Sequence, residues 1–398
     1  MLGIGFVIRH YDWGSRDALP ALLGREPDGL PWAEAWLGDH PLGPAPIVEP
    51  DAAGFHLDRL IRRDPATTLG PDHERWGDRL PYLLKLLAVE QPLSLQVHPG
   101  SDRAREGFAR ESAAGMPIDA HGRSYKDSSH KPEMVLALTS FDALVGFRPL
   151  TEVRSALAPL DSLLARDVVS LMDGPNPVRQ VLAVLLGGDV APGAVSELVE
   201  ACARCRETGE GDLAAYSTVT GLAAHYPGDP GLAVSLFMRR VTMAPGEALF
   251  VPTGTLHSYL RGVVVEVQAA SDNVLRAGLT PKHLDIPELL ACVDTGHGAP
   301  CHPRESRTGE VRRFDPPVSD FRLAEVRLAG PVEVDWRGPR IVVALEGSVI
   351  AATGAHTRRI SAGQAAFVLG SDGPLRLHGT GRVVVAAPGQ RDLPQSPA

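Results

Sequence analysis

Residues 245–257 read PGEALFVPTGTLH, and this stretch decides the fold expected of the chain. Gly246 supplies a turn, the residues after it make a short apolar strand, and Pro252 ends that strand. His257 then follows at the far side of a short loop. The pattern favours a mainly β fold in which His257 is either a core histidine satisfied by hydrogen bonds or a metal ligand at the open end of the sheet.

The spacing G-x5-P-x4-H resembles the second motif of the cupin β-barrels, in which the histidine points into the barrel mouth. Residues 345–348 (LEGS) and 363–369 (GQAAFVL) resemble the same frame near the end of the chain. There, however, Leu369 stands at the proline position and Pro374 at the histidine position. We therefore expect two jelly-roll barrels of the cupin type, a catalytic one and a metal-less C-terminal one with a structural role.

The chain divides into segments of different periodicity. Residues 1–150 and 227–295 read as short strands and turns and form the expected catalytic domain, whereas residues 151–226 have helical spacing and form an insertion. Residues 296–317 show little periodicity and are expected to be a linker. Residues 318–390 alternate again and predict a C-terminal jelly-roll domain. The fold class is thus mainly β with a helical insertion.

Composition excludes several classes of function. The formal net charge of the chain is -9, and it has no basic stripe, so nucleic acid is not an expected partner. The N-terminus lacks the basic and apolar regions of a signal peptide, and no apolar run could span a bilayer, so we expect a cytoplasmic protein without a membrane partner. Cys202 and Cys205 form a C-x-x-C in a helical pattern that no second pair answers, which favours packing over metal or redox chemistry.

Polar residues alternate along residues 93–99 (LSLQVHP). Residues two apart in a strand project to the same face, so Ser94, Gln96 and His98 project together. Taken alone, Gln96 and His98 are a hydrogen-bonded polar pair at a strand end. They become metal ligands only if further donors converge on them.

Two more segments each contain a pair of charged residues, of opposite sign in the first and of like sign in the second. In residues 130–134 (HKPEM), Glu133 is either half of a salt-bridged turn or an anionic metal ligand, with Lys131 facing a substrate. In residues 270–282 (ASDNVLRAGLTPK), Arg276 and Lys282 lie either in a solvated loop or at a phosphate, which a guanidinium fork and an ammonium charge both bind well. Lysine is rare in this chain, so its presence in both segments hints at a position that arginine cannot fill.

Together these segments resemble the type I phosphomannose isomerases of the cupin superfamily. The similarity runs from about residue 8 to residue 290, with the helical insertion matching only in kind. It extends to further motifs: YDWG (11–14), PWAEAWLGDHP (31–41), LPYLLK (80–85) and FDALVGFR (141–148). The chain departs from the family at Ser258, where alanine is usual, and at Val267-Gln268, where the family has Cys-Met. Neither departure touches an expected ligand.

The resemblance implies one zinc ion per chain, bound by Gln96, His98, Glu133 and His257. Two imidazole nitrogens, a neutral oxygen and a carboxylate suit zinc and leave room for a water or a sugar oxygen. It also implies a reaction, the interconversion of mannose 6-phosphate and fructose 6-phosphate through a cis-enediol, with a small sugar phosphate as partner.

The resemblance makes Arg276 an active-site residue that stabilises the enediolate or grips the phosphate. Glu266, Lys131 and a zinc-bound water are all candidates for the base that moves the proton. Ser94, Asp272 and Lys282 are expected to bind the substrate, and the protein is expected to be a monomer.

Three alternatives follow from the same residues. The first is an isomerase of another sugar or sugar phosphate, and the second is a non-catalytic cupin that binds sugar. The third is an iron cupin oxygenase, which the ligand set with Gln96 and Glu133 argues against because such centres usually use more histidines.

Overall fold

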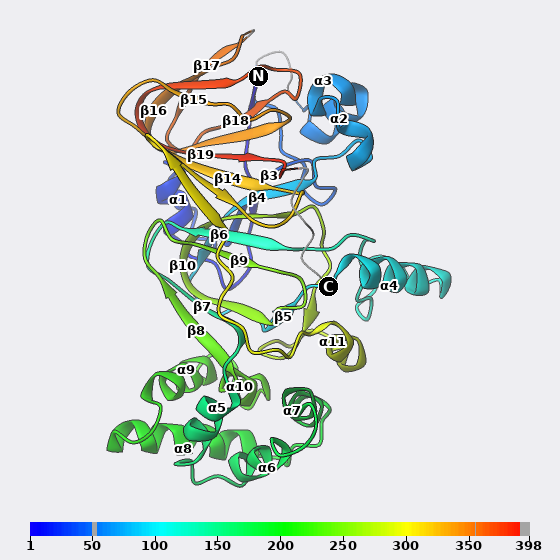
Figure 1. Ribbon diagram of the computed structural model, residues 1–398, viewed down its shortest axis with the longest axis vertical. Coiled ribbons are helices and arrows are strands. Elements are labelled where there is room, and N and C mark those ends of the chain that lie inside the picture. The colour runs from blue at the N-terminus through cyan, green and yellow to red at the C-terminus, as the bar shows by residue number, and fades with distance from the viewer. Residues whose placement is uncertain (50–53, 355, 391–398) are drawn as a thin grey trace.

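The computed structural model describes residues 1–49, 54–354 and 356–390. Two antiparallel sheets and a group of helices lie one after another along the long axis of the molecule, with the helices at the bottom in Figure 1. Within the described residues, no helix is both long and apolar enough to cross a membrane. This arrangement confirms a mainly β protein with a helical insertion.

The ten-stranded sheet is organised around β10 (His257–Ala269). The first half of β10 pairs with β5 and β7, and its second half pairs with β4 and β6, with a shift of register between Tyr259 and Arg261. The single strand β10 therefore joins two different groups of strands in the sheet. The other strands are β2 (Val7–Arg9), β3 (Glu34–Leu37), β4 (Tyr82–Val89), β5 (Gln96–Val97), β6 (Glu133–Ala137), β7 (Phe141–Phe147), β8 (Met238–Met243), β9 (Ala248–Val251) and β11 (Leu275–Arg276).

The nine-stranded sheet contains two long strands, β16 (Arg340–Ala352) and β19 (Leu375–Ala387), which pair with each other. Both lie within the segment 318–390, whose alternation predicts a C-terminal β domain. The remaining strands are β1 (Leu2–Ile4), β12 (Arg304–Thr308), β13 (Val311–Asp315), β14 (Arg322–Leu328), β15 (Val332–Val334), β17 (Thr357–Ser361) and β18 (Ala365–Val368).

The expectation of a linker at residues 296–317 is wrong in part, because β12 and β13 both lie in this segment and pair with each other. Every residue of β12 is exposed, so the strand has no alternation of apolar and polar residues that the sequence could reveal. The other end of the sheet is equally unexpected, since β1 pairs with β18 from the opposite end of the chain.

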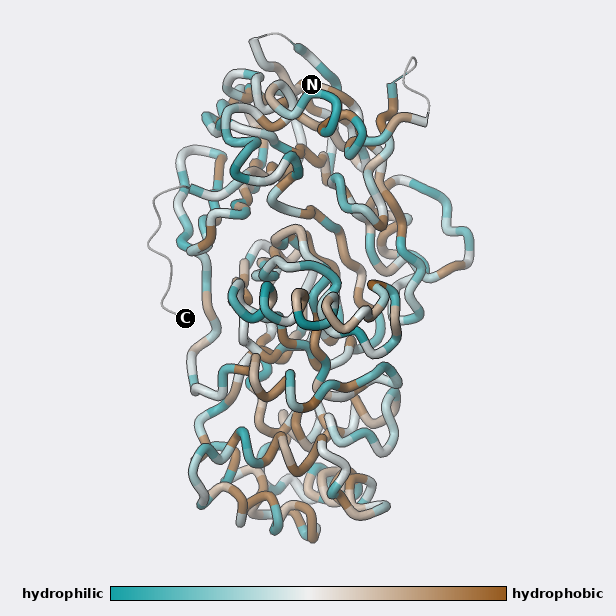
Figure 2. The backbone as a smooth tube through the Cα atoms, turned by 90° about the vertical axis from the view of Figure 1, so that its right-hand side faces the viewer, coloured by the Kyte–Doolittle hydropathy of each residue, from teal (hydrophilic) through white to brown (hydrophobic). Residues whose placement is uncertain are grey.

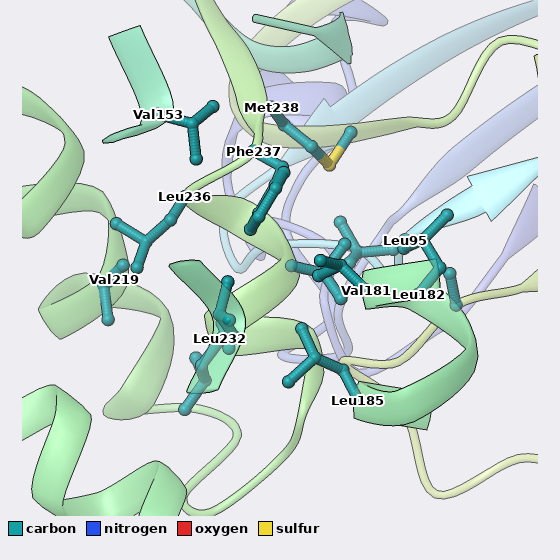
Figure 3. Packing of buried hydrophobic residues seen from close by; sticks show 14 of the residues in the cluster. Leu95, Val153, Val181, Leu182, Leu185, Val219, Leu232, Leu236, Phe237 and Met238 are labelled. Carbon is teal, nitrogen blue, oxygen red and sulfur yellow. The ribbon is translucent and has the colours of Figure 1, made fainter. Parts of the chain in front are cut away.

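Helices fill the expected insertion: α5 (Leu150–Leu157), α6 (Leu163–Leu171), α7 (Pro177–Leu186), α8 (Ala194–Thr208) and α9 (Leu213–Ala223), followed by α10 (Gly231–Ser235). Their apolar faces pack against the ten-stranded sheet, and Figure 3 shows Leu95 beside Val181 and Leu182 of α7. Cys202 and Cys205 belong to the apolar cluster between these helices and the sheet. Burial raises the pKa of the Cys202 thiol to about 12. In Figure 2 the insertion helices carry both apolar and polar residues, as expected for helices with one face on a core.

A second apolar cluster joins the two sheets, with Leu84, Val265 and Val267 from one and Ile341 and Phe367 from the other. Tyr82 of the ten-stranded sheet also contacts the other sheet, because its hydroxyl donates to the carbonyl oxygens of Pro339 and Ala386, both at 3.2 Å. Burial of these side chains is the main force that holds the sheets together. The remaining helices lie outside the insertion: α1 (Ala18–Leu22), α2 (Leu57–Arg63), α3 (Pro65–Leu69), the 3-10 helix η1 (His73–Trp76), α4 (Ser101–Ala113) and α11 (Ile286–Cys292).

Candidate metal centre and active site

The short strand β5 turns its side chains to two different environments. Leu95 and Val97 belong to the cluster shared with the helical insertion, so Gln96 projects to the opposite face. Gln96 lies directly opposite His257 of β10 on one side and Arg276 of β11 on the other. Because residues directly opposed in an antiparallel pair share a face, Gln96, His257 and Arg276 project together.

Three buried residues bring metal-binding atoms to one point: His98, Glu133 and His257. One ligand atom from each lies within 4.8 Å of the others. The Nε2 atom of His98 is 3.1 Å from Oε1 of Glu133, and Nε2 of His257 is 3.4 Å from Oε2. His98 follows β5, Glu133 begins β6 and His257 begins β10, so the sheet register assembles three distant segments of the chain. This is the only such group of His, Cys, Asp and Glu in the part of the chain that the structure describes.

The hydrogen bonds of the two imidazoles decide where their protons lie. Nδ1 of His98 is 2.7 Å from the carbonyl oxygen of Asn273, and Nδ1 of His257 is 3.0 Å from that of Thr255. A carbonyl oxygen can only accept, so each Nδ1 carries the hydrogen, and in the neutral imidazole Nε2 then presents a lone pair. Both lone pairs face the carboxylate of Glu133.

Such an arrangement of acceptors facing an acceptor fits a bound cation. Nε2 of His98 is buried and finds no hydrogen-bond partner among the residues that the structure describes, which is a costly state for a polar atom. Burial, with a smaller contribution from Lys131, lowers the pKa of His98 to about 4, so its imidazole is neutral at pH 7. Two imidazoles oriented by carbonyl oxygens, together with a carboxylate and the nearby amide of Gln96, form a donor set that suits a divalent transition metal.

Two lysines neutralise the buried carboxylates around this centre. Nζ of Lys131 is 2.8 Å from Oε1 of Glu133. Nζ of Lys85 is 3.1 Å from Oε2 of Glu266 and 3.5 Å from Oε2 of Glu34. Sequence reasoning assigned no role to Lys85 or Glu34, although a lysine within the apolar run YLLKLLAV of β4 signals a buried partner of opposite charge.

The two buried glutamates have opposite pKa shifts. Burial raises the pKa of Glu266 to about 7, although Lys85 opposes the shift, and the negative charge of Glu133 adds to it. Burial would also raise the pKa of Glu133, but Lys131 and His98 outweigh it and hold that pKa well below its ordinary value. A carboxyl that titrates near neutral pH beside one that stays ionised is typical of proton-transfer sites.

The residues expected to bind the substrate differ in how deeply they are buried. Asp272 is half-buried, with its carboxylate 3.1 Å from Nε2 of His40, and Ser94 is half-buried two residues before β5 begins. Arg276 is half-buried and has no ion pair among the described residues, and burial lowers its pKa. Lys282 lies on an exposed turn beyond β11. The structure therefore leaves an uncompensated guanidinium beside the candidate metal ligands.

Fold and site together define a class: an antiparallel β protein with one buried His/Glu/His group, among the described residues, that could hold a metal ion. The first 150 residues match the family model of the type I phosphomannose isomerase catalytic domain. The chain is 35% identical over 385 residues to mannose-6-phosphate isomerase of Escherichia coli, covering 94% of this chain and 96% of that one. It is 33% identical to mannose-6-phosphate isomerase 1 of Arabidopsis thaliana, over 91% and 87% of the two chains.

Solved structures agree with these relatives over almost the whole chain. A variant of phosphomannose isomerase from Salmonella typhimurium superposes with a TM-score of 0.89 at 32% identity, covering 98% of this chain and all of that one. A mannose 6-phosphate isomerase bound with zinc and yttrium gives a TM-score of 0.88 at 33% identity, with the same coverage. The chain belongs to the type I phosphomannose isomerase family, which confirms the resemblance of the sequence motifs.

Proposed function

We propose that this chain is a zinc-dependent isomerase that interconverts mannose 6-phosphate and fructose 6-phosphate. The observation that carries the proposal is the buried group His98, Glu133 and His257. It lies in a chain similar along its whole length to mannose-6-phosphate isomerases, one of which has been solved with zinc.

One zinc ion would be held by His98, Glu133, His257 and the side-chain oxygen of Gln96. When bound, zinc would supply a Lewis acid that stabilises negative charge on the sugar oxygens, an effect on the order of several kcal/mol. Each sheet is, on this proposal, a cupin-type jelly-roll barrel, and the C-terminal one holds no metal. The proposed domains are residues 1–150 with 227–295, the insertion 151–226, and 318–390, the last enlarged by the strands at 2–4 and 304–315.

The protein residues divide the remaining work. We assign the proton transfer between C2 and C1 to Glu266, because its pKa near 7 lets it accept a proton from one carbon and return it to the other. Lys85 holds the Glu266 carboxylate in place. Lys131 forms an ion pair with Glu133 and so keeps this metal ligand ionised. On this proposal Lys131 also faces the sugar.

We assign recognition of the phosphate charge to Arg276 and Lys282. The unpaired guanidinium of Arg276 can grip the phosphate with two parallel hydrogen bonds, and Lys282 at the exposed turn adds a second positive charge. We assign the binding of sugar hydroxyls to Ser94 and Asp272. The proposed location is the cytoplasm. The proposed oligomeric state is a monomer, and analytical ultracentrifugation would test it.

The deciding experiment is a coupled assay of fructose 6-phosphate formation from mannose 6-phosphate, run before chelation, after chelation and after addition of zinc. Activity that disappears with the chelator and returns with zinc supports both the reaction and the metal. If the zinc-loaded, folded protein is inactive on mannose 6-phosphate, the substrate assignment is wrong. A screen of other sugars and sugar phosphates then separates a different isomerase from a sugar-binding protein without catalytic activity.

A further inference from the structure

Asn273 is a fully buried residue in the turn between β10 and β11. Its Oδ1 accepts hydrogen bonds from the backbone N–H groups of Lys126 (2.8 Å) and Asp127 (3.2 Å). Its Nδ2 donates to the carbonyl oxygens of Asp127 (2.8 Å) and Ser129 (2.9 Å). All four hydrogen-bonding positions of the amide are used, and a flipped amide would place its oxygen against two carbonyl oxygens.

The partner segment depends on these bonds. Residues 126–129 form neither helix nor strand, so their backbone groups must find partners outside regular structure. Asp127 completes the connection in the other direction, because its carboxylate accepts from the Ser271 hydroxyl and from the Asp272 N–H, both at 2.9 Å. We call residues 126–129 and 271–273 together the amide clamp.

The amide clamp is connected to the metal centre at two points. The backbone carbonyl of Asn273 accepts the Nδ1 hydrogen of His98 at 2.7 Å, which sets the tautomer that turns the Nε2 lone pair towards Glu133. The clamped segment 126–129 leads directly into Lys131 and Glu133. A single side-chain amide therefore holds the chain that orients one ligand and the chain that delivers another.

We infer that Asn273 is a positioning residue that sets the metal affinity of this centre by locking the amide clamp. The inference rests on the proposed function, since it concerns the metal assigned there. Residues that orient metal ligands typically contribute 10- to 100-fold to metal affinity. A residue with only a structural role would lower the stability of the whole protein but leave the affinity of the folded molecules for zinc unchanged.

The test is Asn273→Asp, which keeps the shape of the side chain but replaces the Nδ2 donor with an oxygen and adds an ionisable carboxyl beside Asp127, whereas Ser271→Ala, described below, changes no charge. Its second oxygen would face the carbonyl oxygens of Asp127 and Ser129, so the clamp should open. We expect zinc affinity, measured by competition with a chromophoric chelator, to fall by about 10- to 100-fold. Hydrogen exchange should accelerate in residues 126–130 of the metal-free protein, and the nitrogen-15 signals of His98 should no longer report a single Nδ1–H tautomer.

Two further variants make the result interpretable. Tyr216→Phe removes a buried hydrogen bond to the Ala156 carbonyl in the helical insertion and serves as the matched control, with unchanged zinc affinity expected. Ser271→Ala removes one donor to Asp127 and is the milder probe if Asn273→Asp does not fold, with a several-fold loss of affinity expected.

The outcomes separate the two proposals. If the wild-type protein does not bind zinc, the proposed function fails. If the wild type binds zinc and both clamp variants bind it equally well, Asn273 has only a structural role and the inference is overturned.

Discussion

The two sheets are built alike but surround their buried charges differently. In the nine-stranded sheet the fully buried Glu325 is 2.6 Å from Nε of Arg382 and 3.2 Å from Nη1 of Arg312, so an acceptor meets donors. In the ten-stranded sheet the buried Glu133 is paired with Nζ of Lys131 at 2.8 Å, but it also meets the bare nitrogens of two histidines, so acceptors meet an acceptor there. An antiparallel sheet thus surrounds a buried carboxylate either with donors alone or also with further acceptors, and the second arrangement suits a bound cation.

The largest effect expected from this comparison is the loss of the metal centre. Glu133→Ala removes the only anionic ligand of the three buried residues, so zinc should be lost and kcat/KM should fall on the order of 10³-fold or more. Metal content and the coupled assay measure both quantities. Zinc retained at the wild-type level in this variant would contradict the ligand assignment.

The corresponding change in the other sheet should act on stability alone. Glu325→Gln leaves Arg382 and Arg312 without their buried counter-charge, which should lower the free energy of unfolding by about 3–5 kcal/mol. Denaturant titration gives this value, while zinc content and kcat/KM of the folded protein should stay unchanged. Loss of zinc in this variant would break the comparison.

The pH dependence of stability should report Glu266. Its pKa is about 7 in the folded protein against an ordinary value of 4.5, so between these pH values the folded state holds more protons than the unfolded state. The free energy of unfolding should therefore fall as the pH rises through this window, by up to about 3 kcal/mol.

The measurement is chemical denaturation of the metal-free protein at several pH values, with Glu266→Gln as the reference. Burial raises the pKa of Asp39 to about 6 in the same direction, so the difference between wild type and variant isolates Glu266. Parallel curves for the two proteins would show that Glu266 does not titrate in this range.

Arg276 should contribute to substrate binding without holding the metal. Arg276→Ala should raise KM for mannose 6-phosphate by about 10- to 100-fold, because charge-assisted hydrogen bonds to the phosphate are lost. Zinc content should not change, and any turnover of unphosphorylated mannose should be unaffected. An equal loss with both sugars would place Arg276 at the reacting carbons instead.

The smallest effect is expected at an exposed arginine of the nine-stranded sheet. Arg376 pairs with Glu333 at 3.0 Å, but both side chains are largely exposed. Arg376→Ala should change the free energy of unfolding by less than about 1 kcal/mol and leave KM unchanged. It therefore serves as the arginine control for Arg276.

The sequence predicts the parts of the fold that depend on local pattern. The stretch 245–257 predicts the strand β9 and the histidine that begins β10, and alternation in residues 93–99 predicts that Gln96 and His98 share a face. Helical spacing predicts the insertion. Each of these signals depends on residues a few positions apart.

What the sequence could not predict depends on contacts between distant segments. The strand β12 is exposed throughout and carries no apolar alternation, so only its pairing with β13 reveals it. Asn273 lies in a recognisable motif, but its role follows from bonds to residues almost 150 positions away. The partners of Lys85 likewise come from separate strands, which sheet register alone brings together.

The pairing of β1 with β18 has a consequence for synthesis on the ribosome. Leu2 lies opposite Phe367, so the first strand to be made must wait for one of the last before it can take its place at the sheet edge. Meanwhile β2 to β11 can pair among themselves, since they lie between residues 7 and 276. We therefore expect the ten-stranded sheet of a nascent chain to become protease-resistant first, with residues 2–4 exposed until β18 has been made.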